Sequence, residues 1–318
     1  MTTPRGFRNG TSSPATGAAR ATQPAPSAEA ESSAARDRRR RLIVDAQVHL
    51  WRAEAPDRPW PPGGAARAQL PEPFTIEKLL PLMDEAGVDR AVIVPPSWEG
   101  DRVDYALEAA NKHPGRFAVM GRIPIASPHA PALLPRWKDQ PGMLGIRLTF
   151  QRAHAAWLTD GTADWFWPAA EQAGIPVMFL ACGQMGEFAK IAERQPELVL
   201  IIDHMGLSLD IARANMIAQA LGETVALAKY PNVSVKLSSA PAYSSEPYPF
   251  RDMNVHLHRV FDAFGPQRCY WGTDMTNSFA KASYRQRITH FTEELDFLSE
   301  EDKDWIMGSA ILARLGWT

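Results

Sequence analysis

The sequence predicts a (β/α)8 TIM barrel, a single domain of the α/β class preceded by a disordered N-terminal tail. Three observations lead to this fold: eight short apolar runs rich in β-branched residues, helical patterns between them, and polar residues where the runs end. Apolar strands that alternate with helices indicate a parallel sheet covered by helices, and eight such units close into a barrel. The runs lie at residues 42–49, 90–96, 116–124, 143–150, 175–182, 198–206, 232–239 and 268–275.

The segment before the first run, residues 1–41, is rich in Ala, Ser, Pro, Thr and Arg and has Phe7 as its one aromatic residue. Such a composition cannot bury enough apolar surface to offset the entropy lost on ordering, so we expect a disordered tail. The arginines at 38–41 lead into a strand that contains Asp45, which makes a poor secretory signal. A mis-assigned start codon or an organelle transit segment is left open. The barrel is expected over residues 42–318.

Helical patterns fill the intervals between the apolar runs, for example at residues 75–87, 104–115 and 163–174. Each of these three ends in glycine, which supplies the left-handed residue that commonly terminates a helix. An open doubly wound sheet is the alternative arrangement of such units. No glycine-rich phosphate-binding fingerprint follows the first run, which favours the barrel.

Charge and cysteine content bear on partners and location. Eight arginines and three acids fall within residues 1–41, so that segment carries five net positive charges and the remainder seven negative charges. A mildly acidic barrel argues against a nucleic-acid partner. No apolar run approaches the roughly 20 residues of a membrane span. Cys182 and Cys269 lie far apart, so we expect no disulfide, a reducing compartment and a cytoplasmic location.

Polar residues end most of the apolar runs, where their burial would otherwise be costly. In a barrel these strand ends converge on one mouth, the place where barrel enzymes carry their active sites. Asp203 is the exception, because strand alternation relative to His204 predicts that it points toward the helices. The residues expected at the mouth are Gln47, His49, Arg122, Arg147, His204, Lys236, Ser238 and Asp274.

Two long loops are candidates for substrate selection, since specificity of barrel enzymes varies in loops at this end. Residues 51–73 begin with Trp51, and residues 239–256 contain Tyr243 and Arg251. We expect these three residues to bind substrate. Four tryptophans near strand ends are expected to wall a flat ring: Trp51, Trp60, Trp98 and Trp271.

Several of these motifs together resemble the amidohydrolase superfamily. "VDAQVHLW" is similar to its strand-1 signature, usually Asp-x-His-x-His before an aromatic residue, "LIIDHMG" to its strand-6 motif and "CYWGTDM" to its strand-8 motif. "IMGSAILARLGW" resembles the closing segment. The resemblance covers residues 42–318 and looks most like the amidohydrolase-2 branch, which includes pyrone-dicarboxylate lactonase and metal-dependent decarboxylases. It implies a barrel hydrolase and says little about substrate.

The departures from the family pattern bear on metal binding. Members with one Zn²⁺ typically use two strand-1 histidines, a histidine of strand 5 or 6 and the strand-8 aspartate. Here Gln47 replaces the first histidine, and Arg147 stands where a bridging ligand for a second ion would be. Glutamine is a weak neutral donor for zinc. We therefore expect no cofactor, with one divalent ion such as Zn²⁺, held by His49, His204 and Asp274, as the alternative.

The resemblance to the lactonases implies the roles of the mouth residues. Asp274 would be the general base for water, and His49, His204 and the Gln47 amide would polarise the carbonyl. Arg147 and Arg122 would hold a carboxylate of the substrate, the group that guanidinium binds in paired hydrogen bonds. Lys236 is placed among the substrate-binding residues.

The expected function is therefore hydrolysis of a lactone or carboxylic ester of a small molecule that carries a carboxylate or an aromatic ring. One alternative is a metal-dependent decarboxylase of an aromatic or enoic acid, which would release CO₂. Another is a non-catalytic binding barrel. A homo-oligomer is left open.

Overall fold

The computed structural model describes residues 40–318, so the expectation of a disordered tail lies outside the described residues except at its last two positions. Eight parallel strands form one sheet in the order β1-β2-β3-β4-β5-β6-β7-β8. They are β1 (Val44–Val48), β2 (Arg90–Ile93), β3 (Phe117–Gly121), β4 (Met143–Thr149), β5 (Val177–Leu180), β6 (Leu200–Ile202), β7 (Val233–Lys236) and β8 (Cys269–Tyr270). Each lies within its predicted run, and the (β/α)8 barrel is confirmed.

The sheet closes where β8 meets β1. Ala46 N donates to Trp271 O at 3.2 Å, and Asp274 N donates to Gln47 O at 3.0 Å. Gly272 allows this approach, because a Cβ there would lie 3.2 Å from the backbone nitrogens of both Ala46 and Gln47. A β-branched residue at this position would push the two strands apart.

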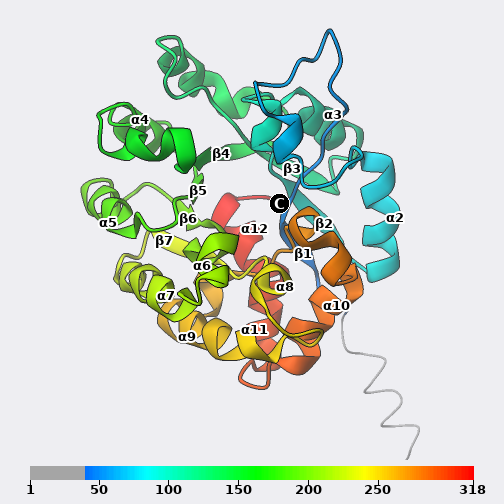
Figure 1. The fold of residues 1–318 in the computed structure, drawn as a ribbon. Coiled ribbons are helices and arrows are strands. Elements are labelled where there is room, and N and C mark those ends of the chain that lie inside the picture. Colours follow the sequence, from blue (N-terminus) through cyan, green and yellow to red (C-terminus); the bar gives the residue numbers. More distant parts are fainter. Residues whose placement is uncertain (1–39) are drawn as a thin grey trace, which may run out of the picture. The chain divides into compact units, whose positions relative to one another are not determined.

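Most helices lie outside the strand ring, and the last one lies at its centre in this view (Figure 1). The helices are α2 (Ile76–Ala86), α3 (Asp104–Lys112), α4 (Phe166–Gln172), α5 (Met185–Arg194), α6 (Leu209–Arg213), α7 (Ile217–Val225), α8 (Ala240–Tyr243), α9 (Asn254–Phe264), α10 (Tyr284–Thr289), α11 (Glu300–Asp304) and α12 (Ala310–Leu315). Between β3 and β4 the connection is a 3₁₀ segment, η3 (Ala130–Asp139).

The glycine prediction for helix ends is right at one position and wrong at another. Gly87 follows α2 in a left-handed conformation, with φ of 79°. Gly115 does not end α3, which stops at Lys112 with His113 as its cap. The reason is Pro114, since the residue before a proline is disfavoured in the helical region.

Two apolar clusters fill the structure. The larger one lies between the strands and the surrounding helices. The smaller one lies inside the barrel and joins inward side chains of the strands to Ala310, Ile311 and Leu315 of α12. Arg314 of α12 donates to Asn232 O just before β7, so α12 closes the barrel at the amino ends of the strands. In Figure 1, α12 lies at the centre of the ring. The opposite end is left for polar side chains.

Asp45 ties the closing strands to the helical layer. It is fully buried, and its carboxylate accepts from Gln47 N at 3.0 Å, from Thr273 N at 2.8 Å and from the hydroxyls of Thr273 and Tyr284. Burial raises the pKa of Asp45, against the opposing effect of these hydrogen bonds. The group therefore connects β1, the end of β8 and α10.

We predict that Asp45→Ala lowers the free energy of unfolding by about 3 kcal/mol, because several buried donors lose their acceptor at once. Urea-induced unfolding followed by tryptophan fluorescence measures the change. Asp304→Ala is the matched control: its carboxylate is exposed and pairs with Arg41, an interaction worth less than about 1 kcal/mol. Equal losses in the two variants would contradict the role given to Asp45.

Candidate active site

Six of the predicted residues come together at the carboxyl ends of the strands, inside the barrel. Each is at most 5 % exposed. The six residues are Gln47 and His49 of the first βα segment, Arg147 of β4, His204 after β6, Lys236 of β7 and Asp274 after β8. Their burial, and the way they converge from five strands, make this cluster the candidate active site.

An irregularity in β1 brings Gln47 into the barrel. Val44 and Ala46 point into the inner apolar cluster, and the β1–β2 register shifts between Asp45 and Val48. The shift lets Gln47 follow Ala46 on the inner side, while Val48 packs against the helices. Asp45, two residues earlier, instead bonds outward to Tyr284. Such bulges re-aim side chains near functional sites.

The prediction that Asp203 points toward the helices is wrong. Ile201 lies in the inner cluster, and ordinary alternation carries Asp203 to the same side, where its carboxylate is fully buried among cations. His204 reaches the site because its backbone turns left-handed, with φ of 52°. Alternation fails after Asp203 because β6 has ended there.

A chain of buried charges runs behind the histidines. Arg147 Nε donates to Asp203 Oδ2 at 2.9 Å, and Lys236 Nζ lies 2.7 Å from Asp203 Oδ1. Burial alone would raise the pKa of Asp203, but Lys236 and Arg147 outweigh it and hold that pKa low. Burial lowers the pKa of Lys236, against the attraction of Asp203. We call Arg147, Asp203 and Lys236 the buried charge chain.

The buried charge chain ends on Gln47. Lys236 Nζ donates to Gln47 Oε1 at 2.6 Å. The amide nitrogen of Gln47 then lies 3.2 Å from His204 Nε2 and 3.5 Å from His49 Nε2. Because an ammonium only donates, the amide must turn its oxygen to Lys236 and its N–H groups to the two imidazoles.

His49 and Asp274 form the second half of the cluster. His49 Nδ1 donates to Val94 O at 2.7 Å, and its Nε2 lies 3.0 Å from Asp274 Oδ1. A carbonyl only accepts, so Nδ1 carries a proton, and two bare acceptors would repel at 3.0 Å. A second proton, carried by Nε2 and facing the carboxylate, accounts for this distance.

Asp274 is set up to be ionised. Burial would raise its pKa, but His204, His49 and a hydrogen bond from Ser239 outweigh it and hold the pKa below the usual range. Ser239 Oγ donates to Asp274 Oδ2 at 2.8 Å. Both Asp274, with φ of 45°, and Ser239, with φ of 65°, are left-handed. Strained backbone of this kind persists where the surrounding contacts hold it in place, and it is common at active sites.

Two serines complete the site: Ser238 was expected at the mouth from the sequence, and Ser239 was missed. Ser238 Oγ lies 2.7 Å from His204 Nδ1, and Ser239 Oγ lies 3.1 Å from the same nitrogen. Burial lowers the pKa of His204, against the attraction of Asp274 and Asp203. For Ser239 the signal available in the sequence was the "SS" pair that begins two residues after Lys236, at the end of a predicted strand.

Arg122 stands at the edge of the cluster. Its NH1 lies 3.4 Å from Thr149 Oγ1, which also accepts from Arg147 at 2.7 Å, so two guanidinium groups face one hydroxyl. Burial, and then Arg147, lower the pKa of Arg122 to about 10. The exposed carboxylate of Asp101 lies 3.4 Å from Arg122 Nε, and this nitrogen makes no hydrogen bond within the described part of the chain.

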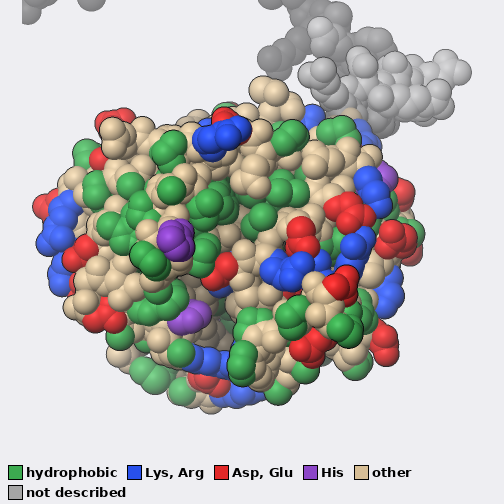
Figure 2. All heavy atoms as spheres, turned by 90° about the horizontal axis from the view of Figure 1, so that it is seen from above, with side chains coloured by type: hydrophobic (Ala, Val, Ile, Leu, Met, Phe, Trp, Pro, Cys, Tyr) green, Lys and Arg blue, Asp and Glu red, His purple; other side chains and the backbone are tan. Residues whose placement is uncertain are grey.

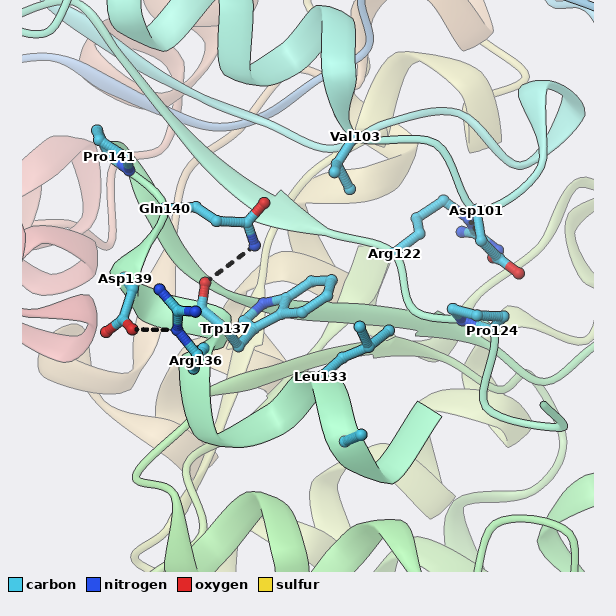
Figure 3. Close-up of a pocket in the computed structure, with 11 residues that line it drawn as sticks. Asp101, Val103, Arg122, Pro124, Leu133, Arg136, Trp137, Asp139, Gln140 and Pro141 are labelled. Atoms are coloured by element: carbon cyan, nitrogen blue, oxygen red, sulfur yellow. Dashed lines mark hydrogen bonds and ion pairs between the residues drawn. The ribbon is translucent and has the colours of Figure 1, made fainter. Parts of the chain in front are cut away.

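Arg122 also lines a groove of about 660 Å³ between η3 and the start of α3. Figure 3 shows Arg122 and Asp101 at one end of the groove, with Trp137 and Leu133 along its middle. Arg122 therefore connects the buried cluster with a cavity that is open to solvent.

Of the three loop residues predicted to bind substrate, Trp51 and Arg251 lie outside the cluster, and Tyr243 lies against Ser239. Trp51 is 1 % exposed and lies behind Trp98, with ring centroids 5.1 Å apart. Tyr243 is buried and donates to Leu207 O at 3.1 Å. Arg251 lies exposed in a 3₁₀ turn. Substrate contact by these three stays a prediction.

Among the four tryptophans, Trp98 touches the site, since its ring lies edge-on to His49 with centroids 5.9 Å apart. Trp271 does not wall the mouth, because it packs on Tyr284 and donates to Arg287 O in the outer layer. It follows Tyr270, which points into the barrel, and so faces the opposite side.

The family resemblance implies a metal ion, and the cluster can be tested for it. His49, His204 and Asp274 are ligand types that zinc uses, so the composition is compatible with a divalent ion. The arrangement does not fit one. An amide N–H of Gln47 points at the Nε2 lone pair of His204 that an ion would need, Lys236 holds the amide in that orientation, and Nε2 of His49 faces Asp274 with a proton between them. Among residues 40–318, no three His, Cys, Asp or Glu side chains are set to hold an ion.

Surface and sequence features bear on partners. On the face seen in Figure 2, Lys and Arg side chains are interspersed with Asp and Glu. None of the helices in the described part of the chain is long and apolar enough to cross a membrane.

Comparison with known proteins places the chain in a family. The amidohydrolase family model matches residues 44–313. L-fucono-1,5-lactonase of Burkholderia ambifaria is 28 % identical over 239 residues, covering 73 % of this chain and 79 % of the relative. 4-Sulfomuconolactone hydrolase of Hydrogenophaga intermedia is 27 % identical over 238 residues, covering 68 % and 70 %.

Among solved structures, an amidohydrolase of Burkholderia multivorans with bound zinc matches with a TM-score of 0.71 at 22 % identity. The match covers 86 % of this chain and 99 % of that protein and shows a shared barrel fold. The predicted hydrolase character is supported by the named relatives. The chain belongs to the amidohydrolase family and is a hydrolase of the amidohydrolase-2 type.

Proposed function

We propose that this protein hydrolyses the ring ester of a small lactone that carries a carboxylate, by direct attack of water. The observation that carries the proposal is the pairing of the ionised Asp274 with donors on the facing side of the site: Asp274 Oδ1 lies 3.0 Å from His49 Nε2, which is 3.5 Å from Gln47 Nε2. The names of the two lactone-hydrolysing relatives support this substrate class.

The carbonyl oxygen of the lactone sits between Gln47 Nε2 and His49 Nε2. Two donors 3.5 Å apart can both bond one oxygen, and in a buried site they stabilise the negative charge that develops on it. Removal of one such donor typically costs about 3–4 kcal/mol of barrier. Gln47 and His49 are therefore assigned to oxyanion stabilisation.

Asp274 acts as the general base. It takes a proton from water as the water oxygen bonds to the carbonyl carbon and the carbonyl electrons move to oxygen. Collapse of this tetrahedral species breaks the ring C–O bond, and the ring oxygen receives the proton. The product is a hydroxy acid, so atoms and charge balance with water as the only co-reactant. Ser239, which donates to Asp274, holds the carboxylate in place.

His204 has a different role from the one expected. Its Nε2 accepts from the Gln47 amide, and its Nδ1 faces the hydroxyls of Ser238 and Ser239. We assign it the positioning of Gln47. Asp274 Oδ2 lies 3.6 Å from His204 Nε2, the nitrogen that accepts from the Gln47 amide.

The carboxylate of the substrate is assigned to Arg122. Arg147 and Lys236 both pair with the buried carboxylate of Asp203. Arg122, the buried cation that reaches the groove, instead faces the exposed carboxylate of Asp101 at 3.4 Å. An anionic substrate group would satisfy Arg122. A cytoplasmic location and a homo-oligomer remain predictions.

We predict that Asp274→Asn lowers kcat for a carboxylated lactone by roughly 10²–10⁴-fold, the usual contribution of a general base. Acid release in a pH-stat measures it, with Asp304→Asn on the exposed helix α11 as the control. CO₂ release from an aromatic acid would point instead to the decarboxylase. Full activity in Asp274→Asn would rule out this base.

We predict that Arg122→Leu raises KM for a carboxylated lactone roughly ten- to a hundredfold, because a charge-assisted hydrogen bond is worth about 1.5–3 kcal/mol. KM for an uncharged lactone of the same ring size stays within about threefold by the same reasoning, as no charged bond is lost. Initial-rate kinetics on both substrates provide the comparison.

Arg136→Leu is the control for the Arg122 variant, since Arg136 lines the same groove but pairs with Asp139 at its other end. If Arg136→Leu and Arg122→Leu raise KM equally, the carboxylate is not held by Arg122.

A further inference from the structure

We propose that Lys236 is a positioning residue that sets the orientation of the Gln47 amide and, through it, the tautomer of His204, so that the site presents donors where a metal ion would need lone pairs. The catalytic consequence of this inference rests on the proposed metal-independent hydrolysis. The orientation of the Gln47 amide and the tautomer of His204 are argued from the contacts alone. The supporting contacts join β1, β6 and β7, whose residues are far apart in the sequence.

The first step is the orientation of the amide. Lys236 Nζ and Gln47 Oε1 are 2.6 Å apart, and both side chains are fully buried. Rotation of the amide by 180° would place its NH₂ group against the ammonium at that distance, with two donors facing each other. Water cannot relieve such a clash in a buried site. The orientation is thus decided by Lys236.

The second step is the tautomer of His204. With its oxygen on Lys236, Gln47 directs an N–H group to His204 Nε2 at 3.2 Å. That nitrogen must accept, so the ring proton sits on Nδ1 and is donated to Ser238 Oγ at 2.7 Å. Ser239 Oγ, which donates to Asp274, accepts rather than donates at the same nitrogen.

The third step is the retention of the lysine charge. A buried ammonium without a partner would lose its proton and could then accept as well as donate. Asp203 Oδ1, at 2.7 Å, keeps Lys236 charged, and Arg147 holds the other carboxylate oxygen. The buried charge chain therefore acts on the amide as a unit.

Because Lys236 requires an acceptor at residue 47, the remaining atom of the residue 47 side chain decides whether the imidazoles face a donor or an acceptor. Gln47→Glu has nearly the same shape and still accepts from Lys236, but its second oxygen presents an acceptor to the imidazoles. His204 must then either carry its proton on Nε2 or bind a cation through its Nε2 lone pair. We expect this one substitution to turn the cluster into a site for one Zn²⁺, held by His49, His204, Asp274 and the new carboxylate.

The test compares four proteins: wild type, Gln47→Glu, the double variant Lys236→Met with Asp203→Asn, and Ser234→Ala. The double variant removes one cation and one anion, which leaves the net charge of the cluster unchanged. Ser234 is the control, because it lies buried two residues before Lys236 on β7 and its hydroxyl donates to Leu200 O rather than to a residue of the cluster. Circular dichroism and thermal unfolding show that each variant is folded.

Two measurements need no substrate. Nitrogen-15 NMR reports the tautomer of His204, and mass spectrometry reports zinc per chain after equilibration with micromolar zinc and gel filtration. We expect wild type and Ser234→Ala to show the Nδ1–H form and no stoichiometric zinc. We expect Gln47→Glu to bind one zinc per chain, and the double variant to show both tautomers.

Kinetics on a lactone substrate supply the third readout. We expect the double variant to lose at least tenfold in kcat with KM changed less than threefold, because amide orientation matters for the oxyanion and not for the carboxylate. If the double variant keeps the Nδ1–H form and the kcat of Ser234→Ala, Lys236 does not position the amide. Stoichiometric zinc on wild type would also overturn the proposal.

These outcomes separate the two proposals. If no lactone is hydrolysed but the tautomer changes as expected, the proposed reaction fails and the role of Lys236 stands. If lactones are hydrolysed and the tautomer does not change, only the role of Lys236 fails.

Discussion

The hydrogen bond from the Lys236 ammonium to the Gln47 carbonyl oxygen determines that the amide nitrogen of Gln47, and not its oxygen, faces the active site. It works because the ammonium is held charged by Asp203 in a fully buried position, and because Arg147 takes the other oxygen of that carboxylate. The remaining hydrogen bonds follow in order: the amide donates to His204, and His204 donates to Ser238. Because these groups are deeply buried, exchanging donor and acceptor in any of these hydrogen bonds would be energetically costly.

The barrel supplies the rigidity that this chain of contacts needs. Helix α12 fills the amino end of the barrel with apolar side chains, and Asp45 joins the closing strands to α10. The carboxyl end is thereby left as the place where polar groups converge. Bulged or left-handed backbone at β1, His204, Ser239 and Asp274 then turns side chains inward that regular strands would point elsewhere.

The site is divided between a closed reaction centre and an open groove. His49, His204 and Asp274 are almost inaccessible, whereas Arg122 belongs to both the cluster and the groove beside η3. This division suits a hydrolase that binds an anionic group of its substrate at Arg122 and excludes bulk water from the carbonyl group of the substrate. Water exclusion strengthens each electrostatic interaction inside.

The sequence by itself determined the barrel and most of the mouth. Apolar runs, helical periods and the polar residues after them are local patterns, and Gln47, His49, Arg147, Lys236 and Asp274 were placed in the cluster from such patterns. Only the tertiary structure decided the directions: that Asp203 points inward, that Trp271 points outward and that Ser239 joins Asp274. The physical reason is that side-chain direction at a strand end depends on where regular pairing stops. That point is set by neighbouring strands and left-handed residues, which the local sequence pattern does not contain.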